Sequence, residues 1–451
     1  MKPSAYNYVT TLSDGTALYF NFYTLALIAL SPSESSLAQS ILSNPNQHLK
    51  NKGASGLKKL FAEKGFLIDD RINEVDLLKK GHFISRLQPN HLSLTIAPTL
   101  NCNFGCTYCY QDKKKQKMNQ EVEEALIHFV RNRVVQDGEL SVTWYGGEPL
   151  LCLDIIRRLS EAFIEICQDN NAQYTASIIT NGYLLDSETA EKLAQWNVKD
   201  AQITIDGPPD IHDARRPLIG GGKTFKTIMD NLKEASKNLI IKVRMNVDHR
   251  NEGYIKKLLA VLANEGLSGN IHFYLGRTYP YTDVCNDLSV WCFNDEEFSL
   301  LGLETAMEAI ECGFGTSGTP ASKNYWCMAD NENAFVITPS GGMVKCWNEI
   351  ADPETEVGHL LKPTTEPMIK NIKRWRRRDP FELECAGCLL LPICMGGCPY
   401  LYELNGKVYC YSWKHQIKES LSFYYYLKKI VQESEIVQEF RDLVDYVKET
   451  A

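Results

Sequence analysis

Short apolar runs and longer helical stretches alternate along the middle of the chain. Six apolar runs predict strands, at residues 92–97, 140–145, 174–180, 200–205, 240–247 and 270–275. Helical stretches lie between them, at residues 120–135, 154–167, 187–196, 224–236 and 251–265. Alternation of this kind predicts an α/β fold, with a parallel sheet and helices outside it.

The first 85 residues follow a different pattern. Strands are predicted at residues 6–10 and 16–21, on either side of a probable hairpin turn at Ser13, Asp14 and Gly15. Helical stretches follow at 34–42 and 56–64, the second ending at Gly65, and residues 66–68 lead into a charged helix near 73–80. Because it also contains no cysteine, this segment is predicted to be a separate small module.

Size and charge limit the classes of protein to consider. The 451 residues are enough for two or three domains, and 44% hydrophobic with 23% charged residues is ordinary for a soluble globular protein. A formal net charge of -8 argues against binding to nucleic acid or to anionic membranes.

The fifteen cysteines are the unusual part of the composition, and eight of them fall between Cys312 and Cys410. Residues 1–10 have no secretory signal, and the apolar stretch at 18–30 is too short to span a bilayer. We therefore expect a cytoplasmic protein without a membrane partner. Thiols stay reduced there, so clustered cysteines are better interpreted as metal ligands than as disulfides.

Three cysteines directly follow the first strand of the alternating region. Cys102, Cys106 and Cys109 are separated by three and then two residues. Three thiolates in one short loop can hold three irons of a cubic iron-sulfur cluster and leave the fourth iron free for a substrate or cofactor. A disulfide would leave one thiol over, and zinc sites favour paired ligands at short spacing.

This cysteine spacing, with the aromatic Tyr108 before the last cysteine, resembles the radical S-adenosylmethionine (SAM) superfamily. The resemblance implies that the free iron chelates SAM, and that one electron cleaves SAM to methionine and a 5'-deoxyadenosyl radical. It also implies a partial (β/α)6 TIM-like barrel, which six strand-helix units match better than a closed barrel of eight. Chemistry in such barrels collects at the C-terminal ends of the strands.

Further motifs follow the predicted strands. Gly146, Gly147 and Glu148 come after the second strand, and taken alone they would be only a tight turn. Within the family resemblance, Gly147 and Glu148 correspond to the motif for the SAM amino group. By the same resemblance Thr204 lies near the SAM ribose, Arg216 near its carboxylate and Tyr108 near adenine, whereas Asp206 and His212 are interpreted as stabilising their loop.

A second cysteine set lies near the C-terminus. Thirteen residues and Gly341 follow Cys327, then four residues and Cys346; later come Cys385, Cys388, Cys394, Cys398 and Cys410. This order is similar to the SPASM extension of radical SAM enzymes. A pair of structural zinc sites is the alternative.

The SPASM resemblance implies two auxiliary [4Fe-4S] clusters besides the SAM-binding cluster. Cys327, Cys346 and Cys398 would hold the first, and Cys385, Cys388, Cys394 and Cys410 the second. The first set is one ligand short, so either Cys312 completes it or the site is open to a substrate group.

These resemblances imply a domain order along the chain. Residues 1–85 would be a winged-helix-like module that recognises peptides, and 86–290 the radical SAM partial barrel. A bridging region at 291–326, an iron-sulfur SPASM domain at 327–415 and a C-terminal helix at 416–451 would follow. A simple N-terminal cap on the catalytic domain is the other interpretation of the first module.

Enzymes with this extension mostly act on peptides or proteins. Sulfatase-maturing relatives carry an aspartate base after the cysteine matched by Cys346, whereas this chain has Trp347. The sequence therefore favours an oxidoreductase that matures a ribosomally made precursor peptide through a C-S or C-C crosslink. Sulfatase-type oxidation, epimerisation and backbone excision remain alternatives, and a non-enzymatic iron-sulfur electron carrier is a further one.

The expected partners are a precursor peptide, bound through its leader, and an electron donor such as flavodoxin or ferredoxin. The expected cofactors are SAM and three [4Fe-4S] clusters. No catalytic side chain is assigned beyond the cysteines of the SAM-binding cluster.

Overall fold

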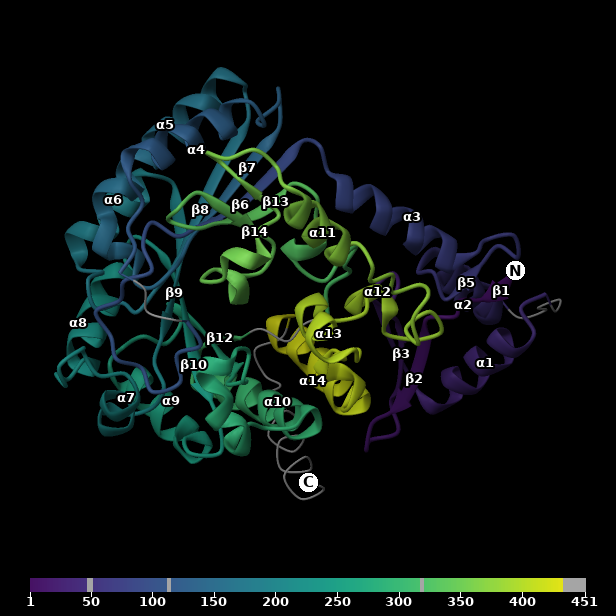
Figure 1. Ribbon diagram of the computed structural model, residues 1–451. Helices are drawn as coiled ribbons and strands as arrows, with labels where there is room; N and C mark the ends of the chain where they lie inside the picture. Colours follow the sequence, from purple (N-terminus) through teal and green to yellow (C-terminus); the bar gives the residue numbers. More distant parts are fainter. Residues whose placement is uncertain (47–51, 112–114, 317–319, 433–451) are drawn as a thin grey trace. The chain divides into compact units, whose positions relative to one another are not determined.

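The computed structural model describes residues 1–46, 52–111, 115–316 and 320–432 (Figure 1). The chain divides into two compact units. The first, here called the sheet unit, comprises Leu87–Ser317 and Met328–Arg377. The second, here called the terminal unit, comprises Met1–Arg86, Gly318–Cys327 and Arg378–Ala451.

The sheet unit is built on a ten-stranded sheet with the order β12-β11-β10-β9-β8-β7-β6-β13-β14-β15. Neighbouring strands from β12 to β13 are parallel, and β14 and β15 continue the sheet antiparallel. The strands are β6 (His91–Ile96), β7 (Glu139–Trp144), β8 (Gln173–Thr180), β9 (Val198–Thr204), β10 (Ile240–Val247), β11 (Ile271–Arg277), β12 (Gly315–Thr316), β13 (Ala334–Ile337), β14 (Gly342–Val344) and β15 (Gly358–His359).

Helices connect the parallel strands and lie along one face of the sheet (Figure 1). They are α4 (Gln120–Arg131), α5 (Leu153–Asp169), α6 (Ser187–Gln195), α8 (Phe225–Ala235) and α9 (Ile255–Asn264), with α7 (Pro209–Arg215) and α10 (Asp295–Glu311) added to them. Asn119 and Asp186 cap α4 and α6 through their side chains, which fixes where those helices begin. The prediction of an α/β fold with a parallel sheet and outer helices is confirmed.

Some elements of this unit were not predicted. The segments of β12 to β15 are two to four residues long, too short to show a period. The helix α10 did carry a signal, because Asn294 and Glu297 form a capping box at its start. Its position after the last predicted strand left it outside the expected repeat.

The terminal unit begins with a three-stranded antiparallel sheet, β2 (Asn7–Thr11), β3 (Ala17–Asn21) and β4 (Ala26–Leu30). The predicted hairpin is confirmed by the pairing of β2 with β3, and Gly15 has a positive φ of 87° in the turn. The strand β4 was missed. Helices α1 (Pro32–Ser43), α2 (Lys52–Glu63) and α3 (Glu74–Leu87) follow, and the two-residue strands β1 (Lys2–Pro3) and β5 (Leu67–Ile68) pair with each other.

The central strand β3 is buried on both of its faces, which explains why the N-terminal segment shares a unit with C-terminal residues. On one face Tyr19 packs into a cluster with Phe61 and Phe66. On the other, Phe20 contacts Trp413 and Tyr424, with ring centroids 6.5 and 6.0 Å away. Burying aromatic rings on both sides makes this strand the core of the unit.

Helices follow in the C-terminal part of the terminal unit, and Cys394 is the last residue of the first of them. They are α12 (Leu391–Cys394), α13 (Pro399–Asn405) and α14 (Ile417–Gln432), whereas α11 (Glu366–Trp375) belongs to the sheet unit. The predicted C-terminal helix at 416–451 corresponds to α14 as far as Gln432, and its residues 433–451 lie outside the described part of the chain.

Within the described ranges, no helix combines the length and the apolar character that crossing a membrane requires.

Replacing Phe20 with Ala is expected to destabilise the terminal unit by about 3–5 kcal/mol, because Phe20 is fully buried between two aromatic partners. Chemical denaturation followed by tryptophan fluorescence measures this loss. The matched control is Val9→Thr, because Val9 is 39% exposed on the neighbouring strand and should change stability by less than about 0.5 kcal/mol. Equal denaturation midpoints for both variants would contradict the packing described.

Candidate functional site

The loop with Cys102, Cys106 and Cys109 leaves the C-terminal end of β6 and is clamped by backbone hydrogen bonds. Gly105 N donates to Pro217 O at 2.7 Å, and Thr107 N donates to Arg215 O at 3.1 Å. Ile219 N donates to Asn103 O at 2.8 Å. The segment after α7 therefore fixes the cysteine loop and brings Arg216 beside it.

The loop after β7 approaches the cysteine loop backbone to backbone. Gly147 N donates to Thr99 O at 3.0 Å, and Glu148 N donates to Asn101 O at 2.7 Å. A Cβ on Gly147 would lie 2.1 Å from Asn101 O, and one on Gly146 would lie 2.3 Å from Thr99 O. Only glycine permits this contact, so the pair of glycines is a steric requirement of the site.

Glu148 is fully buried behind these glycines. Its carboxylate accepts hydrogen bonds from Thr180 Oγ1 at 2.7 Å, Asn181 N at 2.7 Å and Leu150 N at 3.1 Å. Burial nevertheless raises the pKa of the carboxyl group. No cationic side chain lies within 4.0 Å of it in the described residues, so a carboxylate with remaining acceptor capacity faces the cysteine loop.

Cys102 lies next to this carboxylate. Burial, and then the negative charge of Glu148, raise the pKa of the Cys102 thiol to about 12. Its sulfur accepts from Phe104 N at 3.4 Å, and Asn181 Nδ2 lies 3.9 Å away. A metal must displace the proton of such a thiol, and in return it supplies the positive charge that this buried, acidic environment lacks.

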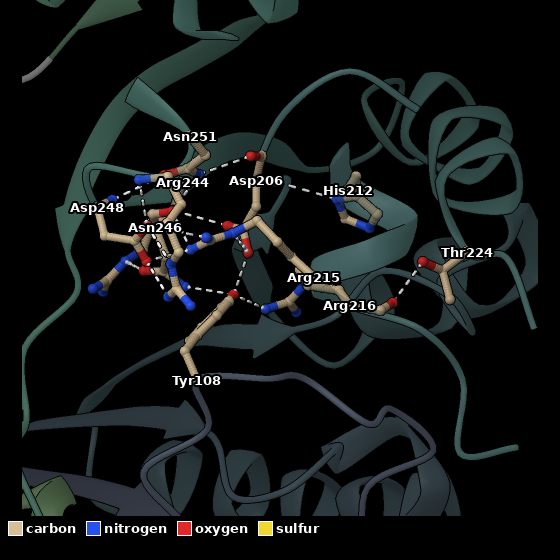
Figure 2. A network of polar contacts seen from close by, with 11 residues as sticks. Tyr108, Asp206, His212, Arg215, Arg216, Thr224, Arg244, Asn246, Asp248 and Asn251 are labelled. Atoms are coloured by element: carbon tan, nitrogen blue, oxygen red, sulfur yellow. Dashed lines mark hydrogen bonds and ion pairs between the residues drawn. The ribbon is translucent and has the colours of Figure 1, made fainter. Parts of the chain in front are cut away.

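On the opposite side of the loop, a network of polar contacts converges on the Tyr108 hydroxyl (Figure 2). The hydroxyl accepts from Arg216 Nη1 at 2.5 Å and from Asn246 Nδ2 at 3.1 Å, and it donates to Asp206. Burial raises the pKa of Tyr108 well above its usual value. Arg216 also stays charged, because Cys106, Tyr108 and Asp206 together outweigh its desolvation and raise its pKa.

Asp206 and His212 stabilise their loop, as the sequence indicated. Asp206 accepts from Asn246 N at 2.9 Å, and its own N–H donates to His212 Nδ1 at 3.2 Å. Burial, followed by the charges of Arg216 and Arg215, lowers the pKa of His212 well below its usual value. A neutral imidazole is therefore built into this loop as a hydrogen-bond acceptor.

Thr204 is the last residue of β9 and is 7% exposed. It pairs with Arg244 on β10, two residues before Asn246. Sequence analysis missed Asn246, although the alternating polar residues of β10 carried a signal, because every second residue of a strand faces the same side.

A cluster of aromatic residues lies between the cysteine loop and the segment after β14. Tyr110 and Tyr145 share a short hydroxyl-hydroxyl contact, and Gln111 Nε2 donates to the Tyr145 hydroxyl at 3.1 Å. The ring of Trp347 lies 5.1 Å from that of Tyr145, and Trp347 Nε1 donates to Thr95 Oγ1 at 3.1 Å. Trp347 is therefore held against Thr95 of β6 and Tyr145 at the end of β7.

In the terminal unit, one pocket gathers four thiols. Its lining includes Cys385, Cys388, Cys394 and Cys410. Burial and then the neighbouring thiols raise the pKa of Cys385 to about 11, and Lys414 Nζ donates to Cys410 Sγ at 3.3 Å. The structure thus brings together the four cysteines that the sequence grouped.

The other predicted set is divided between the units. Cys327 and Cys398 belong to the terminal unit and Cys346 to the sheet unit. Cys312 ends α10, where its carbonyl accepts from Ser268 Oγ at 2.7 Å before β11 begins. Cys346 instead follows β14, so these two thiols belong to segments near opposite edges of the ten-stranded sheet.

Across residues 1–46, 52–111, 115–316 and 320–432, no three His, Cys, Asp or Glu side chains converge on a point where a single metal ion would bind. A four-iron cluster has a different requirement, because each thiolate binds a separate iron. Cys102, Cys106 and Cys109 lie in one loop, so their thiolates could each bind a separate iron of one cluster.

Gly147→Ala is expected to force the two loops apart and to cost about 1–3 kcal/mol of stability. Thermal unfolding checks the stability, and mass spectrometry after brief alkylation checks whether Cys102 becomes more reactive. Gly253→Ala is the matched control, because nothing lies within 4 Å of its added Cβ. Equal alkylation rates of Cys102 in the two variants would contradict the close approach.

Comparisons with known proteins agree with this site. The family model of the Radical SAM superfamily matches residues 96–262. Among the relatives, the cysteine-type anaerobic sulfatase-maturating enzyme of Clostridium perfringens is 26% identical over 362 residues, which cover 72% of this chain and 94% of the relative.

Solved structures agree at the level of the fold. Native anSMEcpe with bound AdoMet and Kp18Cys peptide matches with a TM-score of 0.59 and 20% identity, over 78% of this chain and 99% of that chain. Streptococcus suis SuiB bound to precursor peptide SuiA matches with a TM-score of 0.51 and 16% identity, over 88% of this chain and 95% of that chain.

The matched domain covers the cysteine loop, the Gly146-Gly147-Glu148 motif and the polar network around Tyr108. Residues 96–262 are therefore a radical SAM domain, and the chain is an enzyme.

Proposed function

We propose that this enzyme cleaves SAM reductively and modifies a ribosomally made precursor peptide, forming a C-S or C-C crosslink. The sheet unit would be a partial (β/α)6 barrel, residues 1–85 a winged-helix-like peptide-recognition module, and the later cysteines a SPASM domain. Cys102, Cys106 and Cys109 would hold the SAM-binding [4Fe-4S] cluster. When bound and reduced, this cluster supplies the electron that cleaves SAM to methionine and a 5'-deoxyadenosyl radical.

Glu148 is suited to receive the SAM ammonium group. Its three hydrogen bonds leave part of its acceptor capacity unused, and no cationic side chain in the described residues lies within 4.0 Å of it. A buried carboxylate without a nearby cation is stabilised when a positively charged ammonium group binds beside it. Gly147 keeps the backbone close enough to the cysteine loop for both groups to reach one ligand.

The polar network supports roles for Arg216, Tyr108 and Thr204 in holding the rest of SAM. Arg216 Nε is buried and has no hydrogen-bond partner in the described residues, so the guanidinium keeps a donor for the SAM carboxylate. Tyr108 orients this guanidinium through its hydroxyl. Thr204 lies at the end of the strand that leads into the same loop, as a ribose contact requires.

The identity of residue 347, a tryptophan, is the observation that favours crosslinking over sulfatase-type oxidation. In the sulfatase-maturing family, an aspartate base would stand at this position. The Trp347 side chain has no basic atom, and its contacts with Tyr145 and Thr95 hold it against β6 and the end of β7. Crosslinking does not need a base there, because a substrate thiolate can attack a carbon radical while a cluster accepts the released electron.

Auxiliary clusters would provide that electron acceptor. The pocket of Cys385, Cys388, Cys394 and Cys410 supports a fully ligated second cluster. Cys327, Cys346 and Cys398 would hold the first. Because Cys312 precedes the edge strand β12 and Cys346 follows β14, near the other edge of the sheet, we propose that Cys312 is not the fourth ligand and that the site is open to substrate.

The peptide leader would bind the three-stranded sheet of the terminal unit, where β2 and β4 are edge strands. Point changes test this role better than deletion of residues 1–85, because deletion would expose Trp413 and Tyr424. A flavodoxin or ferredoxin would supply electrons. A reducing cytoplasm would suit the cysteines of the described residues, which form no disulfide with one another.

The triple variant Cys102→Ala, Cys106→Ala and Cys109→Ala is expected to form no 5'-deoxyadenosine from SAM and dithionite under anaerobic conditions. Its auxiliary iron should remain, because the later cysteines are unchanged. The buried-thiol variant Cys167→Ala is the control, since Cys167 lies in α5 away from the loop. SAM cleavage by the triple variant would refute the assignment of the cluster.

The product is tested with the short reading frame next to the gene, co-expressed with the enzyme. Loss of two hydrogens from the peptide, with fragment ions missing between the joined residues, is expected for a crosslink. An unchanged mass would indicate epimerisation, a larger loss would indicate excision, and an oxidised cysteine without a crosslink would indicate sulfatase-type chemistry. Each of these three results would reject the crosslink.

Replacing Cys385 and Cys394 with Ser is expected to remove about four irons per chain, because both thiols line one pocket. Iron analysis and Mössbauer spectroscopy measure the loss. Cys152→Ala is the control, since Cys152 is buried beside α5 and should change no iron content. Full iron content in the double variant would exclude a cluster at the pocket.

A further inference from the structure

One face of β10 carries polar side chains close to the polar network around Tyr108. Along this strand Ile241, Val243 and Met245 are fully buried on the helix side, whereas Lys242, Arg244 and Asn246 alternate with them on the other face. Figure 2 shows Arg244 beside Asn246 within the polar network. This places a cationic side chain on the face where a substrate would meet SAM.

Arg244 has no carboxylate partner within 4.0 Å in the described residues, although other arginines of the sheet unit do. Arg215 pairs with Asp248 at 3.0 Å, and Arg158 pairs with Glu123 at 2.7 Å. Even the neighbouring Lys242 is paired, with Asp200 at 2.8 Å. A half-buried arginine without a counter-charge is stabilised electrostatically when an anion binds to it.

The neighbours of Arg244 orient its guanidinium without neutralising it. Arg244 Nε donates to Asn246 Oδ1 at 2.8 Å, and Asn246 Nδ2 in turn donates to the Tyr108 hydroxyl at 3.1 Å. On β11, the Tyr274 hydroxyl donates to Gln202, and the charge of Arg244 acts on this hydroxyl. These contacts use only part of the five N–H donors of an arginine.

Gly276 makes room for this arrangement. It pairs with Asn246 across the two strands, and a Cβ at Gly276 would lie 2.0 Å from Arg244 Nε and 2.5 Å from its Cζ. Any other residue at position 276 would displace the guanidinium. The strand β11 is therefore shaped to let Arg244 lie flat against its backbone.

We propose that Arg244 binds a carboxylate of the substrate and so selects the residue that is placed next to SAM. This inference rests on the proposed function, because it assigns the substrate side of the same site. A planar guanidinium with free donors matches a carboxylate through two parallel hydrogen bonds. The carboxylate could belong to an aspartate or glutamate side chain or to a peptide C-terminus, and both present the same group.

The test uses small probes with the full-length, reconstituted enzyme in the presence of SAM. N-acetyl-aspartate N-methylamide presents a side-chain carboxylate, N-acetyl-alanine presents a terminal one, and N-acetyl-asparagine N-methylamide is the neutral analogue. Equilibrium dialysis with labelled probes measures binding. At least one carboxylate probe is expected to bind, and the one that binds more tightly identifies the source of the carboxylate.

Arg244→Gln is expected to weaken binding of that probe by roughly tenfold to a hundredfold, as for the loss of hydrogen bonds to a charged group. Arg244→Lys should retain part of the affinity, because it keeps the charge and loses the planar fork. Gly276→Ala should weaken binding while the arginine remains. Lys242→Gln is the matched control on the same strand and face, and it should bind the probe as the unmodified enzyme does.

Any of three results would overturn the proposal. The first is that the unmodified enzyme binds neither carboxylate probe, and the second is that it binds the asparagine analogue as tightly as a carboxylate probe. The third is that Arg244→Gln binds the carboxylate probe as tightly as the unmodified enzyme does. A higher SAM requirement for 5'-deoxyadenosine formation in Arg244→Gln would instead assign the guanidinium to SAM. Because dialysis does not depend on turnover, failure of SAM cleavage in the unmodified enzyme would be seen separately, as failure of the proposed function.

Discussion

The contact between two backbones, after β6 and after β7, is the constraint on which the site depends. Gly147 and Glu148 donate to Thr99 and Asn101, at distances that leave no space for a Cβ on either glycine of the motif. The contact fixes Glu148 behind the cysteine loop. Glu148 then holds the loop after β8 through Thr180 and Asn181, so three consecutive strand ends become one rigid element.

The electrostatics of the site follow from that geometry. Burial raises the pKa of Glu148, and burial together with the negative charge of Glu148 raises the pKa of the Cys102 thiol. Nearby positive charge would stabilise the ionised forms of both groups. The chain supplies some of it through Arg216, which the Tyr108 hydroxyl and Asp206 hold beside the loop. The remainder must come from what binds, and an iron-sulfur cluster with an ammonium-bearing cofactor has the required charge.

Much of this arrangement could be predicted from the sequence, because it depends on local signals. Parallel strands with helices between them have a clear periodicity, and the cysteine spacing and the Gly146-Gly147-Glu148 motif fall at strand ends. The convergence of Asn246 on Tyr108 could not be predicted. It joins residues 138 positions apart, and a strand register decides it rather than any local pattern.

The packing of the terminal unit escaped sequence analysis for a similar reason. The strand β3 reads as a half-buried hairpin strand, yet both of its faces are buried, because Phe20 meets Trp413 nearly four hundred residues later in the chain. Hydrophobic pattern reports that a residue is buried and does not identify its partner. The predicted boundary of the N-terminal module is therefore a statement about sequence pattern rather than about packing.

In the function proposed here, substrate choice would depend on side chains outside the motifs for SAM. Around the strand ends, Glu148 and Arg216 are held by backbone contacts and by a dense polar network, whereas Trp347 lies against β6 and Arg244 lies on β10. One lacks the basic atom that abstraction of a substrate proton would need, and the other has a charge without a counter-charge. If a substrate carboxylate neutralises Arg244, its charge is buried only when the correct residue is in place. Selection of the substrate residue would then be electrostatic. It would take place at Arg244, two residues along β10 from Asn246 and the polar network proposed to hold SAM.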